Sequence, residues 1–238
     1  MVDLELEDGL AVITIDRPHA RNAISLETMD QLDKALDGAD GAAALVITGA
    51  GDRAFVSGGD LKELGALRTE REAGAMAWRM RSICDRIAGF AGPTIAALNG
   101  HALGGGAEVA VAADIRLAAD DIKIGFNQVA LEIMPAWGGA ERLVELVGYS
   151  KALLLAGTGM ILTAEEARSD GLVDHVIARE SFDAEWRRIA TALARRPAGE
   201  IKRVLRGVTT TEAVATFARL WVSDEHWTAA DKVMKRGK

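Results

Sequence analysis

Two glycine-rich segments, each lying between an apolar run and a helix-like run, constrain the fold of this chain more than any other feature. Residues 54–61 read AFVSGGDL, and residues 99–108 read NGHALGGGAE. Glycine lets the backbone approach a ligand closely, and the free N–H groups at a helix N-terminus favour negative charge. Two such turns brought together predict a pair of N–H donors around one oxygen, an oxyanion hole. The alternative is that both are ordinary tight turns.

The segments around these turns alternate between strand and helix patterns. Apolar runs predict strands at 10–15, 43–48, 94–98, 114–118 and 122–126, with a weaker signal at 172–177. Helical spacing predicts helices after an N-cap at Ser25, at 66–88 and at 107–113. Strand, turn and helix recur with short links, which predicts an α/β layered architecture.

The C-terminal part of the chain, from about residue 180, has a different character. Three amphipathic stripes follow one another, with apolar residues at helical spacing: Phe182, Trp186, Ile189 and Leu193; Ile201, Val204, Leu205 and Val208; and Phe217, Leu220 and Trp221. The stripes fit either simple core packing or an oligomer surface.

Composition excludes several classes of protein. The chain has 238 residues, enough for one large domain, and a net charge of −7, which argues against nonspecific nucleic-acid binding. The one cysteine, Cys84, rules out an intrachain disulfide. No apolar run is long enough to cross a membrane, and the acidic N-terminus has no signal-peptide pattern. We expect a cytoplasmic protein without membrane or nucleic-acid partners.

Motifs for several common chemistries are missing from the sequence. The four histidines have no metal-ligand spacing, so no metal is expected. There is no GxxxxGK[ST] loop, no GxGxxG fingerprint and no GxSxG elbow, so neither a bound nucleotide cofactor nor a serine nucleophile is expected.

Glu108 is the only ionisable residue between Leu103 and Ala113. A carboxylate in such an apolar run is costly to bury unless it has partners. It is either a general acid/base with a tuned pKa or a first-turn carboxylate that complements the helix dipole. Asp114, which ends the same run, is expected to bond backbone groups where helix passes to strand.

At these residues the chain resembles the crotonase superfamily, the enoyl-CoA hydratase/isomerase family. The matching landmarks are Asp16-Arg17-Pro18 with Asn22-Ala23, the two glycine turns (54–64 and 99–108), Ala113-Asp114-Ile115, Pro135-Ala136-Trp137-Gly138-Gly139 and residues 167–173. The resemblance runs from about residue 3 to residue 180, with a weaker helical tail.

The resemblance implies an α/β fold, a spiral of ββα units over residues 1–180, followed by a helical oligomerisation region over residues 181–238. It implies a homotrimer or a hexamer built from two trimers. The implied substrate is an acyl-CoA thioester, whose coenzyme A is part of the substrate, so no separate cofactor is expected. Gly59 and Gly105 match the two positions whose N–H groups hold the thioester oxygen.

Further substrate-binding positions also follow from the resemblance. Asp60, Leu61 and Lys62 match positions that line the acyl-CoA site, and the stretch containing Ala20 and Arg21 matches the region near the nucleotide end of the coenzyme. Arg17 and Arg21 are candidates for phosphate contacts, with solvated surface charges as the alternative.

The chain departs from the hydratase pattern at one position. Family hydratases use two glutamates to position and split water, and Glu108 matches the first. The second position, counted from Glu108 and anchored at Pro135, is Gln128. A glutamine orients water but does not exchange a proton at neutral pH. Glu132 is a substitute only if the backbone turns it inward; the alternative is a solvent-facing carboxylate.

An oxyanion hole with one carboxylate suits thioester enolate reactions that move one proton, such as double-bond isomerisation or decarboxylation of a malonyl-type thioester. Residues 133–145, the GGGAE turn and the C-terminal KRGK resemble the ethylmalonyl-CoA decarboxylases of this superfamily. Trp137 is then a wall of the acyl pocket, or alternatively a packing residue. A non-catalytic acyl-CoA-binding protein is the competing class of function, and it would bind without turnover.

Overall fold

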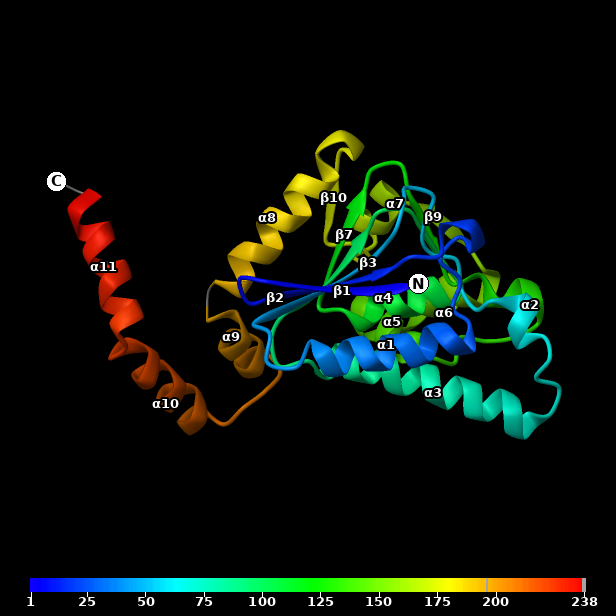
Figure 1. The fold of residues 1–238 in the computed structure, drawn as a ribbon, viewed down its shortest axis with the longest axis horizontal. Coiled ribbons are helices and arrows are strands. Elements are labelled where there is room, and N and C mark those ends of the chain that lie inside the picture. The colour runs from blue at the N-terminus through cyan, green and yellow to red at the C-terminus, as the bar shows by residue number, and fades with distance from the viewer. Residues whose placement is uncertain (196, 237–238) are drawn as a thin grey trace.

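The chain folds around two β-sheets, which Figure 1 shows with helices packed on both sides. The computed structural model describes residues 1–195 and 197–236. The six-stranded sheet is parallel except for the β1–β2 hairpin. Its strands, in spatial order, are β1 (Val2–Glu7), β2 (Leu10–Ile15), β3 (Ala44–Gly49), β5 (Thr94–Leu98), β7 (Ile115–Ala119) and β10 (His175–Ile177). The four-stranded sheet contains β4 (Ala54–Val56), β6 (His101–Leu103), β8 (Lys123–Gly125) and β9 (Ile161–Thr163).

Successive strands alternate between the two sheets. β3, β5 and β7 lie side by side in the first sheet, and β4, β6 and β8, which directly follow them, lie in the same order in the second. A helical segment closes each pair of strands, so the chain forms successive ββα units. This arrangement confirms the expected spiral.

The helices cover the sheets and connect the units. In chain order they are η1 (Pro18–Ala20), α1 (Leu26–Gly38), α2 (Leu61–Leu64), α3 (Glu70–Gly89), α4 (Gly105–Ala112), η2 (Asn127–Leu131), α5 (Gly139–Val147), α6 (Tyr149–Thr158), α7 (Ala164–Ser169), η3 (Arg179–Ser181), α8 (Phe182–Ala194), α9 (Ala198–Leu205), α10 (Thr210–Trp221) and α11 (Asp224–Arg236). Ser25 caps α1 as expected, because its hydroxyl accepts a hydrogen bond from the Thr28 N–H.

The predicted helix at 66–88 begins later than expected. Thr69 and Glu72 form a reciprocal capping box, which starts α3 at Glu70, and a separate short helix, α2, directly follows the first glycine turn. The three-residue strands β4, β6 and β9 and the edge strand β1 were not predicted. β4 contains the first three residues of the first glycine-rich segment, and β6 lies within the second, directly before Gly104.

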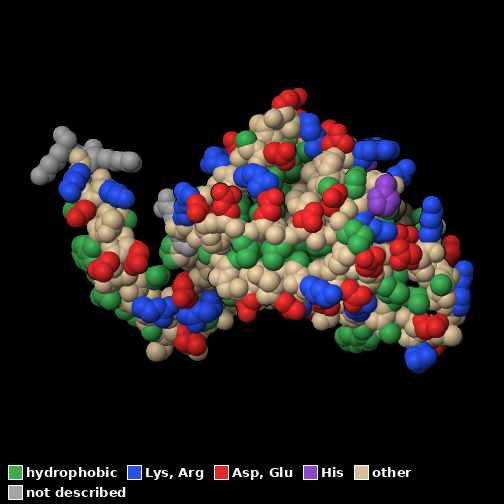
Figure 2. All heavy atoms as spheres, viewed as in Figure 1, with side chains coloured by type: hydrophobic (Ala, Val, Ile, Leu, Met, Phe, Trp, Pro, Cys, Tyr) green, Lys and Arg blue, Asp and Glu red, His purple; other side chains and the backbone are tan. Residues whose placement is uncertain are grey.

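The C-terminal helices divide into two groups. α8 packs on β2, β3 and β7, where it buries Phe182 and Trp186, so its apolar stripe belongs to the core. α10 and α11 project from the body as an arm (Figure 1), and Figure 2 shows hydrophobic side chains along it. The exposed apolar residues of this arm are Val214, Phe217, Trp221, Val222, Trp227, Val233 and Met234. The division at residue 180 stays a prediction.

Two further sequence-based expectations are compared here with the residues that the structure describes. The C-terminal KRGK run, residues 235–238, lies partly outside them. Within them, no helix combines the length and the apolar composition that a membrane crossing requires.

Candidate active site

The two glycine turns meet at one end of the second sheet. β4 and β6 are parallel neighbours, so the turns that follow them leave the same sheet edge. A Cβ atom built on Gly58 would lie 3.5 Å from the Gly105 nitrogen, which places the two turns in contact. Within the described residues, neither the Gly59 N–H nor the Gly105 N–H donates a hydrogen bond to the protein. Both predicted oxyanion donors therefore lack an acceptor within the described residues, and their role as an oxyanion hole stays a prediction.

Close packing explains why glycines form the second turn. A Cβ on Gly106 would lie 1.8 Å from the Val56 carbonyl oxygen, so only glycine allows α4 to approach β4. Gly104 has a φ of 56°, a conformation that most side chains disfavour. These constraints set the N-terminus of α4, and with it the position of Glu108 one turn later.

Glu108 is buried, and four N–H groups surround its carboxylate. Oε1 accepts from Gln128 Nε2 at 2.9 Å and from the Ala136 N–H at 3.3 Å. Oε2 accepts from the Trp137 N–H at 2.7 Å and the Gly139 N–H at 3.0 Å. The three backbone donors precede or begin α5, where free N–H groups favour an anion. The segment from Ala136 to Gly139 therefore fixes the orientation of this side chain.

Two opposing effects act on the acidity of Glu108. Burial raises the pKa of this carboxyl above its ordinary value because the charged form loses solvation, and the four N–H donors partly oppose that rise. A buried carboxyl with a raised pKa can exchange a proton closer to neutral pH than an exposed glutamate can. The first-turn dipole alternative does not account for these four contacts.

Gln128 lies beside Glu108, where the sequence count predicted it. It sits in η2 and is buried; its Nε2 donates to Glu108, while its Oε1 is buried without a hydrogen-bond partner in the described part of the chain. Glu132 directly follows η2, has a φ of 56° and is exposed. Glu132 therefore does not face inward as a second carboxylate beside Glu108.

Trp137 lies against both glycine turns. A Cβ built on Gly105 would fall 2.1 Å from its Cζ3 atom, and one built on Gly59 would fall 3.8 Å from its Cζ2 atom. The side chain is 6% exposed. Trp137 thus packs beside Gly59 and Gly105, as the packing alternative requires, and its role as a wall of the acyl pocket stays a prediction.

The other predicted binding residues surround the first turn. Asp60 caps α2 through the Lys62 N–H and pairs with Arg17 at 3.0 Å, whereas Leu61 and Lys62 are exposed. Ala20 belongs to η1, and the Arg21 carbonyl accepts from the Ser57 N–H at 3.2 Å. Within the described ranges, neither Lys62 nor Arg21 forms an ion pair.

Arg17 corrects one sequence-based expectation. It was a candidate for phosphate contact or a solvated charge, but its side chain is buried, donates to the Ala23 carbonyl at 2.5 Å and pairs with Asp60. A guanidinium held in this way stabilises the loop that carries the first turn. Arg21 remains the candidate for the phosphates.

Gly139 is the contributor that sequence reasoning did not single out. A Cβ there would lie 2.4 Å from Glu108 Cγ, so glycine permits the close approach, and its N–H donates to the carboxylate. The signal was the Gly138-Gly139 pair at the start of a helix. Asp114 has the expected structural role, since it accepts from the Thr94 N–H at 2.8 Å.

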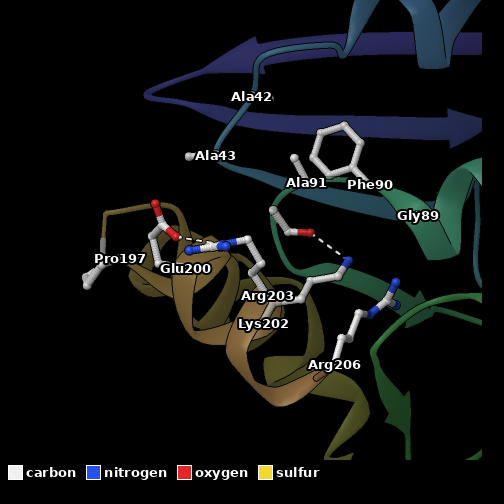
Figure 3. A pocket seen from close by; sticks show the side chains of 12 residues that line it. Ala42, Ala43, Gly89, Phe90, Ala91, Pro197, Glu200, Lys202, Arg203 and Arg206 are labelled. Carbon is white, nitrogen blue, oxygen red and sulfur yellow. Dashed lines mark hydrogen bonds and ion pairs between the residues drawn. The ribbon is translucent and has the colours of Figure 1, made fainter. Parts of the chain in front are cut away.

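A cleft of about 530 Å³ lies away from these residues, between α9 and the loop after α3 (Figure 3). Its cations already have partners. Lys202 Nζ contacts the Gly92 carbonyl at 2.9 Å and Asp114 at 2.7 Å, and Arg203 pairs with Glu200 at 3.1 Å. The Lys202 contacts therefore attach α9 to the core. No group of three potential metal-ligating side chains occurs among the residues that the structure describes.

Comparison with known proteins places this geometry in a family context. The family model described as "Enoyl-CoA hydratase/isomerase" matches residues 5–219. A crotonyl-CoA hydratase of Syntrophomonas wolfei is 39% identical over 193 residues, which is 79% of this chain and 73% of the relative. A short-chain-enoyl-CoA hydratase of Clostridium acetobutylicum is 38% identical over 181 residues, 74% of this chain and 68% of the relative. The crystal structure of an enoyl-CoA hydratase from Bacillus anthracis superposes with a TM-score of 0.87 at 26% identity, covering 99% of this chain and 96% of that one.

Proposed function

Because the chain belongs to the enoyl-CoA hydratase/isomerase family, whose members act on acyl-CoA thioesters, we propose that it decarboxylates a malonyl-type acyl-CoA such as ethylmalonyl-CoA or methylmalonyl-CoA. The observation that carries this choice is the pairing of Glu108 with an amide, Gln128, instead of a second carboxylate.

The first step needs only the oxyanion hole. The thioester oxygen accepts from the Gly59 and Gly105 N–H groups, and the bond between C2 and the substrate carboxylate breaks. Carbon dioxide leaves, and the electron pair of the broken bond becomes the thioester enolate, whose oxygen carries the negative charge. Donors fixed before the reaction stabilise this charge without having to reorganise.

The second step needs one proton. The enolate takes a proton at C2, which yields the shortened acyl-CoA, and Glu108 is the proposed donor, replenished from solvent. Burial raises the pKa of Glu108, which increases the fraction of the protonated acid near neutral pH. The ionised form is accommodated afterwards by the four N–H donors.

Hydration of a 2-enoyl-CoA is the second candidate, and the similarity to a crotonyl-CoA hydratase and a short-chain-enoyl-CoA hydratase favours it. Water addition across the double bond requires removal of a proton from water and delivery of a proton to the neighbouring carbon. Gln128 contributes hydrogen bonds but no proton exchange to that task. Double-bond isomerisation, which shuttles one proton, stays an alternative that the same site serves.

The proposed location of the coenzyme portion of the substrate follows from the positions of two exposed cations. We place the nucleotide phosphates near Arg21 and Lys62, two exposed cations beside the first turn. No cofactor beyond the substrate takes part in this scheme. We further propose that the exposed apolar side chains of α10 and α11 are covered in a homotrimer or a hexamer.

The test compares three substrates with one protein: ethylmalonyl-CoA, crotonyl-CoA and a 3-enoyl-CoA. We expect carbon dioxide release from the first, with loss of about 100-fold or more in Glu108→Ala. Glu108→Gln controls for the loss of volume, and unfolding curves control for folding. Rapid hydration of crotonyl-CoA without carbon dioxide release would contradict the proposal, and binding without turnover of any substrate would indicate a non-catalytic acyl-CoA-binding protein.

A further inference from the structure

The six-membered ring of Trp137 spans the space between the two glycine turns. Its Cζ3 atom is 2.1 Å and its Cη2 atom 2.5 Å from where a Gly105 Cβ would stand. On the Gly59 side, Cζ2 and Cη2 lie 3.8 Å and 3.9 Å from the corresponding position. One edge of the indole therefore borders both residues whose N–H groups are the proposed donors to the thioester oxygen.

The ring is held in place through its own backbone. The Trp137 N–H donates to Glu108 Oε2 at 2.7 Å, and its carbonyl accepts from Arg142 Nη1 at 3.5 Å. Arg142 in turn pairs with Asp85 of α3 at 2.5 Å. A residue fixed at both backbone groups, with a 6% exposed side chain, has little freedom to swing away.

A second apolar side chain closes the other side of the first turn. Leu64 Cδ1 lies 2.8 Å from the Gly59 Cβ position, and Leu64 is buried. Trp137 and Leu64 thus flank Gly59 from two elements, α2 and the segment before α5. Apolar atoms of Leu64 and Trp137 therefore lie beside the first predicted oxyanion donor.

We propose that Trp137 determines substrate specificity by limiting the length of the acyl group. The Gly59 and Gly105 N–H groups hold the thioester oxygen and thereby position the carbonyl carbon. The rest of the acyl chain extends from that carbon. A chain that extends toward the indole meets the ring after a few carbons, so short acyl groups fit and long straight chains do not. This inference rests on the proposed binding of an acyl-CoA at this hole, but not on which reaction follows.

The expected change in affinity for a long acyl chain follows from the burial of its methylene groups. Each methylene that moves from water into an apolar site improves affinity about fourfold. Removal of the indole in Trp137→Ala opens space for several methylenes, so we expect the affinity for a long chain to rise at least tenfold. Trp137→Phe, with a smaller ring, should give an intermediate gain.

The test measures binding with inert ligands, independently of catalysis. Ketone analogues of acyl-CoA, in which a methylene separates sulfur from the carbonyl, are titrated calorimetrically with four-carbon and ten-carbon chains. The wild-type protein should prefer the short chain at least tenfold, and Trp137→Ala should reverse or abolish that preference. Trp78→Ala, at an exposed tryptophan of α3, is the matched control and should change nothing.

The outcomes separate this inference from the proposed function. If Trp137→Ala and Trp137→Phe fold and bind but keep the wild-type chain preference, the inference is wrong. If no analogue binds the wild-type protein, both proposals fail. If carbon dioxide is not released from any substrate but the chain preference shifts as expected, the specificity role of Trp137 stands and the decarboxylase proposal does not.

Discussion

Gly105 is a glycine because of Trp137, and this gives the sharpest structural prediction. Gly105 begins α4 with no positive φ, so its backbone accepts alanine without strain. The three heavy atoms nearest to the new Cβ all belong to the indole of Trp137, and the first of them lies 2.1 Å away. Carbon atoms prefer separations of about 3.5–4.0 Å, so the ring or the helix must move by about 1.5 Å. Overpacking of this kind destabilises a protein by about 1–3 kcal/mol.

The same substitution should be harmless once the ring is gone. In Trp137→Ala, which by itself costs about 3–5 kcal/mol as a large-to-small change, the Gly105→Ala methyl enters vacated space. Alanine is also a better helix former than glycine by up to about 1 kcal/mol. The double-mutant cycle should therefore show a favourable coupling of about 1–3 kcal/mol between the two sites.

Urea unfolding of the wild-type protein, the two single variants and the double variant measures this coupling. Gly106→Ala is the matched control, because its Cβ would lie 1.8 Å from the Val56 backbone oxygen, which no side-chain truncation removes. Its destabilising effect should be the same in the wild-type background and in the Trp137→Ala background. Additivity of Gly105→Ala and Trp137→Ala within about 0.5 kcal/mol would refute the reasoning.

Three further predictions concern acidity, the C-terminal attachment and assembly. The kcat/KM for decarboxylation should fall as pH rises through the pKa of Glu108, which burial raises above the ordinary 4.5. Gln128→Ala removes a hydrogen-bond donor that lowers this pKa, so the fall in kcat/KM should move to higher pH. Asp114→Asn should destabilise the fold by about 2–4 kcal/mol in urea unfolding, because it leaves the buried Lys202 ammonium without its carboxylate partner. Light scattering should give three or six times the monomer mass, and Phe217→Asp on the exposed arm should give smaller species.

Each of these predictions has a control and a contradicting result. A pH profile that Gln128→Ala leaves in place would show that this hydrogen bond does not act on the titrating group. Asp170→Asn, in a more exposed ion pair with Lys151, should change stability by less than about 1 kcal/mol, and an equal loss in both variants would contradict the argument from burial. A monomeric wild-type protein would contradict the assignment of the arm.

The sequence predicted the elements whose signals are local. Each glycine turn follows an apolar strand and precedes a helix, and Glu108 is the one charge in an apolar run, so both could be recognised without coordinates. β4, β6 and β9 have three residues each, too few for alternation to be recognised. The C-terminal stripes were seen, but their partners were not, because periodicity shows an apolar face without showing what covers it.

The sequence did not predict contacts between residues that lie far apart along the chain. Counting from family landmarks located Gln128, but nothing local indicated that its amide would donate to Glu108. The burial of Arg17 depends on Asp60, 43 positions along the chain, and a lone arginine carries no pattern that predicts such a partner. The contact of the Trp137 ring with Gly105 likewise arises only when α5 and α4 pack together.

The central claim is that an amide at position 128, in place of a carboxylate, directs this site to one-proton chemistry. The most direct test is to measure carbon dioxide release from ethylmalonyl-CoA and hydration of crotonyl-CoA by the wild-type protein and by Gln128→Glu. We predict decarboxylation without appreciable hydration in the wild-type protein, and a gain of hydration of at least tenfold in Gln128→Glu. Fast hydration by the wild-type protein, unchanged or reduced in Gln128→Glu, would contradict the account.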